Sequence, residues 1–442
     1  MSSATEFPAS PSAASCPFMS GDSGHSGAQQ APSAQAPSAG APPADVAIFF
    51  DPLSFAAYDN PYELYKNLRD NAPVYFSERR NLYVISRHED VHAALKNDAQ
   101  LVNSLGNDMD GTHDSYGLGN LVAQDPPRHT VLRAAVRRVF AAREILAKED
   151  GLREMCEQLL ADMHANGSGD FAAEFALPFA LSAATSLVGV PAKDIPLLQG
   201  HLWRSMQRTV GAFGLPDDAA TSNHEAEEHL AAVFKRRLTA VNSGADTTDS
   251  EAITQIILSQ QKGKVEENEQ VGLAHLVISA AIDAPAALVT NIVAILDKFP
   301  HLQGYLKRNP SMIPAFVEEA LRYDTPGQNL CRQSTTEITI AGVTIPADSR
   351  IMLLQGSANR DERVFENPDS FDITREFTPQ KRIMSFGDGI HACMGSPLAR
   401  LAARIFVETL VAGPEIRIVG MPERWVKQMV RGFSKLPVQF IN

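Results

Sequence analysis

The sequence is poor in cysteine, and this scarcity excludes a fold held together by disulfides. Only four cysteines occur in 442 residues, at Cys16, Cys156, Cys331 and Cys393. None belongs to a C-x-x-C pair, so neither a disulfide framework nor a cysteine-based zinc site is indicated. We therefore expect a reducing compartment, the cytoplasm.

Long apolar runs and an excess of positive charge are also missing. We find no run of about eighteen apolar residues, the length of a membrane span, and no basic-then-apolar secretory signal. The formal net charge of −13 disfavours nucleic acid as a partner, because phosphates would be repelled. The hydrophobic content of 44% is typical of a globular protein with a sizeable core.

The chain divides into a tail and one large domain. Residues 1–45 consist mainly of Ala, Pro, Ser and Gly, so we expect a disordered N-terminal tail. No second linker interrupts 46–442, and apolar periodicity predicts mostly α-helix with minor antiparallel β-structure. The expected helices begin with one capped at Asn60-Pro61 and continue at 88–96, 130–142, 149–165, 222–242, 249–262, 266–298, 300–308, 311–323 and 396–412. Strands are expected at 74–76 and 82–85 as a hairpin, within 337–354, and at 437–440.

A glycine-rich segment, SFGDGIHACMGSPLAR at 385–400, surrounds Cys393. Gly387, Gly389 and Gly395 allow tight turns and a close approach of the backbone to a flat ligand. The N-terminal N–H groups of the helix expected from 396 stabilise an anion, so we expect a thiolate at Cys393. A thiolate of this kind can be the axial ligand of an iron. A buried structural cysteine in a tight turn is the alternative.

Phe386, Gly389, Cys393 and Gly395 fill every fixed position of F-x-x-G-x-x-x-C-x-G. This is the signature of the cytochrome P450 superfamily, and the sequence resembles its soluble, bacterial-type, ferredoxin-dependent members over about 46–442. The resemblance implies the P450 fold, haem b (iron protoporphyrin IX) as cofactor, and Cys393 as the axial ligand of the haem iron. Phe386 is then expected to pack beside the sulfur and shield it from water.

A second motif of the family lies on the helix expected at 311–323. Glu319 and Arg322 match E-x-x-R, and residues three apart on a helix share one face. Arg375, in FDITRE, matches the arginine that joins this pair. The resemblance assigns the three residues a structural role behind the cysteine loop.

Four further residues match the family's partners for the haem propionates. His129 and Arg133, in DPPRHTVLR, stand four apart on a predicted helix, while Arg332 and His391 lie elsewhere in the sequence. Buried carboxylates need cationic or hydrogen-bonding partners. The resemblance therefore places all four at the haem edge.

The helix expected at 266–298 departs from the family pattern. In place of A-G-x-D/E-T-T it has Ala280, Ala281, Asp283, Ala284 and Pro285, without the threonine that guides protons to oxygen. Proline has no N–H, so the carbonyl of Ala281 loses its helical partner and the helix should bend. We expect Asp283, Ala284 and Pro285 at the catalytic position.

Two functions are compatible with this departure. In the favoured one, Asp283 delivers protons with the help of water or a substrate hydroxyl, and the protein is a monooxygenase that uses electrons from a separate ferredoxin. In the other, the protein uses peroxide, reduces nitric oxide or carries out other non-oxygenating chemistry. A haem sensor is a third possibility.

The resemblance also indicates the substrate and electron partners. Substrate contacts are expected from 101–120, 203–215, Val277, Ala280, Ala281, Gly327–Leu330 and Phe433, and the amides at Gln328 and Asn329 predict a small substrate with an oxygen function. Basic residues expected on the proximal haem face predict docking of an acidic ferredoxin or flavodoxin, served by an NAD(P)H reductase. They are Arg137, Arg138, Arg143, Lys381, Arg382, Arg400 and Arg404. A monomer is expected.

Overall fold

Helices dominate the part of the chain that the computed structural model describes, which is residues 48–109, 118–194, 197–198, 200–201, 204, 207–244 and 250–441. All of them belong to one compact unit that begins at Ala39. The predicted tail at 1–45, with Cys16, lies outside the described residues. So do parts of the expected substrate segments 101–120 and 203–215.

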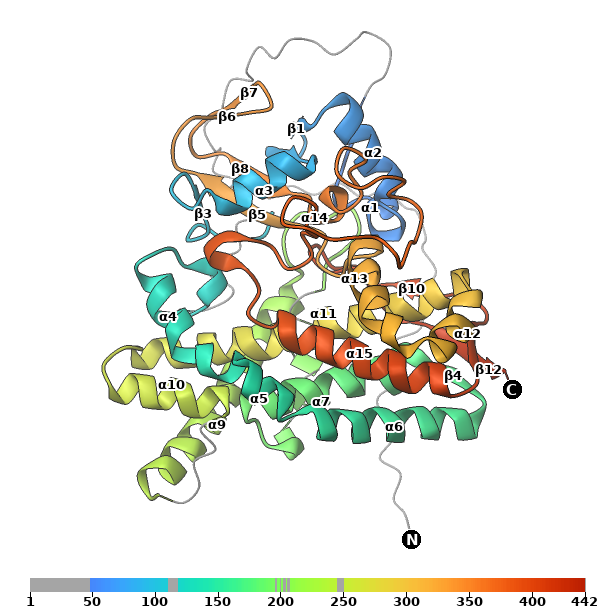
Figure 1. Ribbon diagram of the computed structural model, residues 1–442. Helices are drawn as coiled ribbons and strands as arrows, with labels where there is room; N and C mark the ends of the chain where they lie inside the picture. Colours follow the sequence, from blue (N-terminus) through green and yellow to red (C-terminus); the bar gives the residue numbers. More distant parts are fainter. Residues whose placement is uncertain are drawn as a thin grey trace, which may run out of the picture. The chain divides into compact units, whose positions relative to one another are not determined.

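Figure 1 labels the helices in chain order. They are α1 (Phe55–Asp59), α2 (Tyr62–Asn71), α3 (His88–Lys96), α4 (Arg128–Val136), α5 (Ala142–Leu146), α6 (Glu149–Asn166), α7 (Leu177–Val188), α9 (Asp217–Asn242), α10 (Ala252–Gln261), α11 (Gln270–Lys298), α12 (His301–Arg308), α13 (Ile313–Tyr323), α14 (Gln355–Ala358) and α15 (Ser396–Ala412).

Within the described residues, the strands form one larger sheet and three small ones. They are β1 (Val74–Ser77), β2 (Leu82–Ile85), β3 (Leu101–Val102), β4 (Ser168–Asp170), β5 (Leu330–Ser334), β6 (Ile338–Ile340), β7 (Val343–Ile345), β8 (Arg350–Leu353), β9 (Glu415–Ile418), β10 (Glu423–Arg424), β11 (Phe433–Lys435) and β12 (Pro437–Ile441). The five-stranded sheet has the order β1-β2-β8-β5-β3, a three-stranded sheet has the order β4-β12-β9, and β6-β7 and β10-β11 are two-stranded. Within this unit the larger sheet and the long helices occupy different ends (Figure 1).

The predicted fold class is confirmed, and several elements follow the sequence prediction closely. The helices at 88–96 and 396–412 have the expected bounds. The hairpin is antiparallel, with Val74 opposite Ile85. The single helix expected at 130–142 is wrong, because α4 ends at Val136 and a short 3-10 turn, Arg137–Phe140, leads into α5.

The sequence prediction missed α7, and its burial gives the reason. Phe179, Ala180, Ala183, Leu187 and other residues of α7 are buried, and the helix packs against α11 and α6. The more accessible side of α7 carries Leu177, Leu181 and small hydroxyl side chains but no charged residue, so the contrast by which an amphipathic helix is detected is weak.

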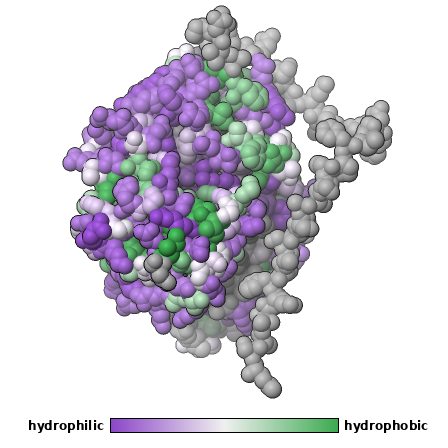
Figure 2. Space-filling model, turned by 90° about the vertical axis from the view of Figure 1, so that its right-hand side faces the viewer, coloured by the Kyte–Doolittle hydropathy of each residue, from purple (hydrophilic) through white to green (hydrophobic). Residues whose placement is uncertain are grey.

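Helix α11 is the central element of the core. It contacts α7, α9, α13 and α15 and continues through Pro285 without interruption. By length and composition alone the stretch Glu267–Lys298 could cross a membrane, but 67% of its most apolar window is buried inside the protein. On the face shown in Figure 2, hydrophilic side chains predominate and hydrophobic ones form small separate patches.

Candidate functional site

The loop before α15 folds back on itself around Cys393. Its backbone N–H donates to the carbonyl of Phe386 at 2.9 Å, which closes the loop. Gly389 has φ +68°, and a Cβ there would lie 2.6 Å from the carbonyl oxygen of Leu95. Only glycine fits this contact with the end of α3, so the family's fixed glycine at this position has a steric cause.

Asp388 attaches the same loop to its surroundings. Its Oδ2 accepts from His92 Nε2 on α3 at 2.7 Å and from Arg382 Nη1 at 2.8 Å. Burial by itself would raise the pKa of Asp388, but the N–H of Gly389, His92 and the Arg382 charge together lower it. A carboxylate therefore holds the loop against α3.

Opposing effects act on the thiol of Cys393. Its burial, the largest effect, raises the pKa of the thiol, whereas the N–H groups of Gly395 and Ser396 and the Arg133 charge lower it. The thiolate expected at Cys393 stays a prediction. A bound metal ion would stabilise it, because a coordinating thiol is deprotonated outright.

Basic side chains from separate elements converge beside this loop. The rings of His129, on α4, and His391 lie 4.3 Å apart between centroids, and Arg133 Nη2 donates to the Ala392 carbonyl at 2.6 Å. Among the described residues, His129 Nε2, His391 Nε2 and Arg332 Nη1 are buried without a hydrogen-bond partner. Such atoms are costly unless an anionic ligand satisfies them.

The electrostatics of this basic cluster point to the same need. Burial, followed by the charges of Arg332, His129 and Arg133, lowers the pKa of His391 to about 2. Burial is also the largest cause lowering the pKa of His129, and it lowers that of Arg332 to about 10. Two carboxylates would restore the favourable environment, so the cluster fits a dianionic ligand such as the propionates of haem b.

Glu319, Arg322 and Arg375 form a buried network behind the loop. Two bonds of 2.7 Å join the fully buried Arg322 and Glu319, and Arg375 Nε donates to Glu319 Oε2 at 3.2 Å. Arg322 also donates to the carbonyls of Asn359 and Pro368. The network therefore ties α13 to the segment that precedes the cysteine loop.

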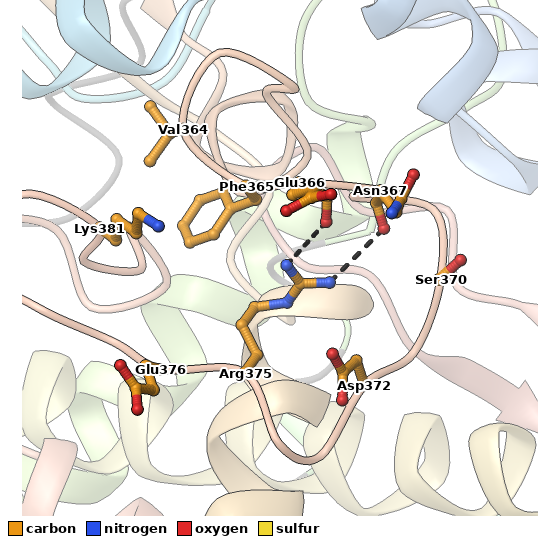
Figure 3. Close-up of a pocket in the computed structure, with 9 residues that line it drawn as sticks. All are labelled: Val364, Phe365, Glu366, Asn367, Ser370, Asp372, Arg375, Glu376 and Lys381. Carbon is orange, nitrogen blue, oxygen red and sulfur yellow. Dashed lines mark hydrogen bonds between the residues drawn. The ribbon is translucent and has the colours of Figure 1, made fainter.

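Figure 3 shows a pocket beside this network, with Arg375 donating to the carbonyls of Glu366 and Asn367. The pocket is lined by residues between Val364 and Lys381. Cys393, the basic cluster and α11 do not line it. We therefore do not assign the active site to this pocket.

The stretch of α11 from Ala280 to Pro285 has one accessible face. Ala280 is exposed and Ala281, Ala284 and Pro285 are half-buried, whereas Asp283 is buried. Ala280 and Ala284 stand four apart and share one side of the helix. The face that the family places above the haem is therefore apolar and made of small side chains.

Asp283 has a partner that the sequence did not reveal. Its Oδ2 accepts from Lys427 Nζ at 2.5 Å, and both side chains are almost fully buried. The two residues are 144 positions apart, so no local pattern could have indicated the pair. Lys427 is the functional candidate that sequence reasoning missed.

The predicted substrate amides are engaged within the protein. Asn329 Nδ2 donates to the Gln428 carbonyl at 2.9 Å, and Gln328 Nε2 donates to the Thr325 carbonyl at 2.7 Å. Both side chains are buried. The amide nitrogens are therefore engaged by the protein, whereas Gln328 Oε1 is buried without a hydrogen-bond partner among the described residues. A substrate contact at these amides stays a prediction.

Several of the predicted docking residues are paired with carboxylates. Arg400 bonds Glu318, Arg404 bonds Glu149 and Glu408, and Arg382 bonds Asp388. Arg143 keeps a side chain that is 91% exposed and contacts Glu144 only at 3.8 Å. Three of the seven basic residues predicted for docking are thus neutralised by carboxylates, so the positively charged surface is smaller than predicted.

The fold and site together define a haem-thiolate protein, with a cysteine before a helix and a basic cluster suited to two carboxylates. Comparison with known proteins agrees. The family model for cytochrome P450 matches residues 309–419. The biotin biosynthesis cytochrome P450 of Bacillus subtilis is 30% identical over 392 residues, which cover 86% of this chain and 96% of the relative.

Two solved structures share the fold of this chain. The crystal structure of CalO2 has a TM-score of 0.80 at 28% identity, covering 89% of this chain and 99% of that chain. The cytochrome P450 PksS of the Bacillus subtilis 168 bacillaene polyketide synthase has a TM-score of 0.79 at 26% identity, covering 89% and 100%. The chain belongs to the cytochrome P450 family: it is an oxidoreductase of the monooxygenase class, and its cofactor is haem b.

Proposed function

We propose that this protein is a cytoplasmic, monomeric monooxygenase that places one atom of O₂ into a small organic substrate and releases the other as water. Two electrons and two protons are consumed per turnover, and hydroxylation, epoxidation or O-dealkylation can result. The electrons come from a separate ferredoxin or flavodoxin with its NAD(P)H reductase. The bound haem supplies the activation of oxygen.

The buried Asp283, next to the accessible face of α11, is the observation that carries this proposal. Oxygen activation needs protons at that face, and the usual threonine is replaced by Ala284. Asp283 is the ionisable side chain on α11 adjacent to Ala284, and it is held at a defined place by Lys427. A carboxylate can accept and release a proton there.

Other residues bind and orient the cofactor. Cys393 would be the ligand of the haem iron, and the backbone N–H groups of Gly395 and Ser396 point at its sulfur. His129, Arg133, Arg332 and His391 would hold the propionates. The Arg400 guanidinium lies 4.5 Å from the Phe386 ring centroid, which fixes this ring at the loop.

The substrate portion next to α11 is apolar in this proposal. The accessible side chains of this helix face are Ala280, Ala281, Ala284 and Pro285, and apolar surface binds apolar groups by excluding water. The predicted substrate contacts Val277 and Phe433 are also hydrophobic and buried. An oxygen function on the substrate would have to be bound elsewhere.

Peroxide use is the second candidate, but the Lys427 contact argues against its usual form. Peroxide users of this family place an arginine beside the proline for a fatty-acid carboxylate, and residues 282–287 contain none. Lys427, which bonds the neighbouring Asp283 at 2.5 Å, is already neutralised. A substrate carboxylate would have to compete with a buried ion pair.

The electron partner is expected to dock through the more exposed basic residues. Arg137 and Lys381 are exposed, as is Arg143 on α5, which packs against α15. Arg143→Glu should slow reduction by ferredoxin, while Lys235→Glu, at an exposed position of α9, is the control. The reduction rate should fall as ionic strength rises, and a flat salt dependence would contradict the docking surface.

Product analysis tests the function. The haem-loaded protein is supplied with a ferredoxin, its reductase, NADH and ¹⁸O₂, and with a panel of phenolic ethers and terpenoid alcohols. Substrates that shift the haem spin state should give products in proportion to NADH consumed, with ¹⁸O retained in the product or, for O-dealkylation, in the aldehyde. Near-total diversion to peroxide, combined with good turnover from added peroxide, would refute the proposal. Cys393→Ser is the control that should abolish turnover.

A further inference from the structure

Lys427 lies in the loop between β10 and β11, in a setting unusual for lysine. Its side chain is about 1% exposed, its Nζ bonds Asp283, and the Trp425 ring centroid lies 4.7 Å from the same nitrogen. Lysine is rarely buried unless it is paired. The β10–β11 hairpin thus places the Lys427 ammonium in contact with Asp283 on the central helix α11.

Stability does not account for this pair. Removing two charges from water costs roughly as much as their mutual attraction returns, so a well-packed apolar pair would serve the fold as well. What a Lys–Asp pair has and an apolar pair lacks is an exchangeable proton. The pair lies beside Ala284, where the proposed function requires protons.

Lys427 also lines a small cleft. The cleft is partly enclosed, and its other lining residues include Gln428, Gln328, Asn329, Ala57 and Tyr58. Amide and hydroxyl groups in this lining can hydrogen-bond water. Its free interior accommodates about one or two water molecules.

We propose that Lys427 is the positioning and proton-supplying residue for Asp283, and that this cleft is the route by which protons reach it from solvent. The inference rests on the proposed monooxygenase function. It assigns a residue of the C-terminal hairpin, and a path past α1, to proton delivery at α11.

The proton transfers balance at each atom. The Lys427 ammonium gives one proton to the Asp283 carboxylate, leaving an amine and a carboxylic acid. The acid releases this proton at the face of α11, and the amine takes a replacement from water in the cleft. Two such cycles supply the two protons of one turnover, while ferredoxin supplies the electrons.

Three variants separate proton supply from charge and from folding. Lys427→Met removes charge and proton, and Lys427→Arg keeps the charge but not the exchange, since guanidinium does not release its proton. Lys435→Met is the matched control on the same hairpin, because Lys435 is about half exposed and pairs with the exposed Glu423. All three should retain the reduced carbonyl spectrum of the wild-type protein.

The readouts are the single-turnover rate, its solvent deuterium isotope effect, and the peroxide formed per NADH. Lys427→Met and Lys427→Arg should both be slowed ~10-fold or more, with a larger isotope effect and more peroxide, while substrate-induced spin shift and first reduction stay unchanged. Lys435→Met should match wild type. A fully active Lys427→Arg would show that only the charge matters, and an unchanged Lys427→Met would show that neither does; each overturns the proposal.

A second pair of variants tests the cleft. Ala57→Trp places a large ring at a half-buried position of the lining, whereas Ala56→Trp adds the same ring at the exposed neighbouring position. Ala57→Trp should raise the isotope effect and slow the turnover, and Ala56→Trp should not. Equal behaviour of the two refutes the route.

Failure of the inference is distinguishable from failure of the function. If wild type forms ¹⁸O-labelled product but Lys427→Met behaves like wild type, the monooxygenase function stands and the inference falls. If wild type forms no product with ferredoxin and O₂, the function itself falls.

Discussion

Replacing Glu319 by glutamine should be among the most damaging isosteric changes in this protein. Glu319 is fully buried and accepts bonds from Arg322, from Arg375 and from the backbone N–H of Asp372. The variant Glu319→Gln keeps the shape but removes the negative charge from between two guanidinium groups. Since Arg322 is also fully buried, its charge would be left without a counter-ion.

The expected magnitude follows from burial. Breaking a buried pair by removing one partner costs ~3–5 kcal/mol of the free energy of unfolding. The neighbouring Glu318 provides the matched control, because it bonds Arg400 at 2.5 Å with both side chains about a third exposed. Glu318→Gln should therefore cost ~0–1 kcal/mol.

Urea denaturation of the three proteins, followed by circular dichroism, measures the difference. The reduced carbonyl spectrum adds a functional readout, since the network anchors the segment leading to the cysteine loop, and Glu319→Gln should lose the thiolate form on standing. If Glu319→Gln lies within ~1 kcal/mol of Glu318→Gln, the network is not the structural anchor inferred here.

Three further predictions concern charged groups. Arg332→Met should stabilise the haem-free protein, because Arg332 Nη1 is buried without a partner, yet lower haem affinity ~10–100-fold in competitive transfer assays; equal haem affinity would exclude a propionate contact. Burial alone would raise the pKa of Asp324, but Arg431, Arg424 and Tyr62 outweigh burial and lower this pKa to about 2. A lowered acid pKa stabilises above the ordinary value of 3.8, and this stability, ~2 kcal/mol, is lost as pH falls to about 2. Asp324→Asn should remove that part of the acid dependence of unfolding, and an unchanged profile would contradict it. Cys393→Ser should abolish the thiolate carbonyl spectrum and turnover, and retention of both would refute axial ligation.

The sequence was most informative where a short segment carries its own structural cause. The cysteine loop is encoded within ten residues, because Gly389 must avoid the carbonyl of Leu95 and α15 begins immediately after Gly395. Helices with a polar face, such as α3 and α15, were predicted to the residue for the same reason: their periodicity is local.

The sequence was least informative about environments built by distant segments. Burial around Cys393 raises its thiol pKa against the effect of the helix N-terminus, and no motif encodes that burial. From the sequence, the amide nitrogens of Gln328 and Asn329 could only be taken as free to bind a substrate. The structure shows that they donate to the backbone carbonyls of Thr325 and Gln428.

By itself, the sequence determined the family, the ligand loop and the basic residues suited to haem, because these depend on residue type and short spacing. Only the tertiary structure decided the partner of Asp283, the packing of α7 against α11 and which basic residues remain exposed. Those properties depend on contacts between residues far apart in the chain, such as Lys427 and Asp283. Pairing and burial are set by packing, and packing has no short-range signature.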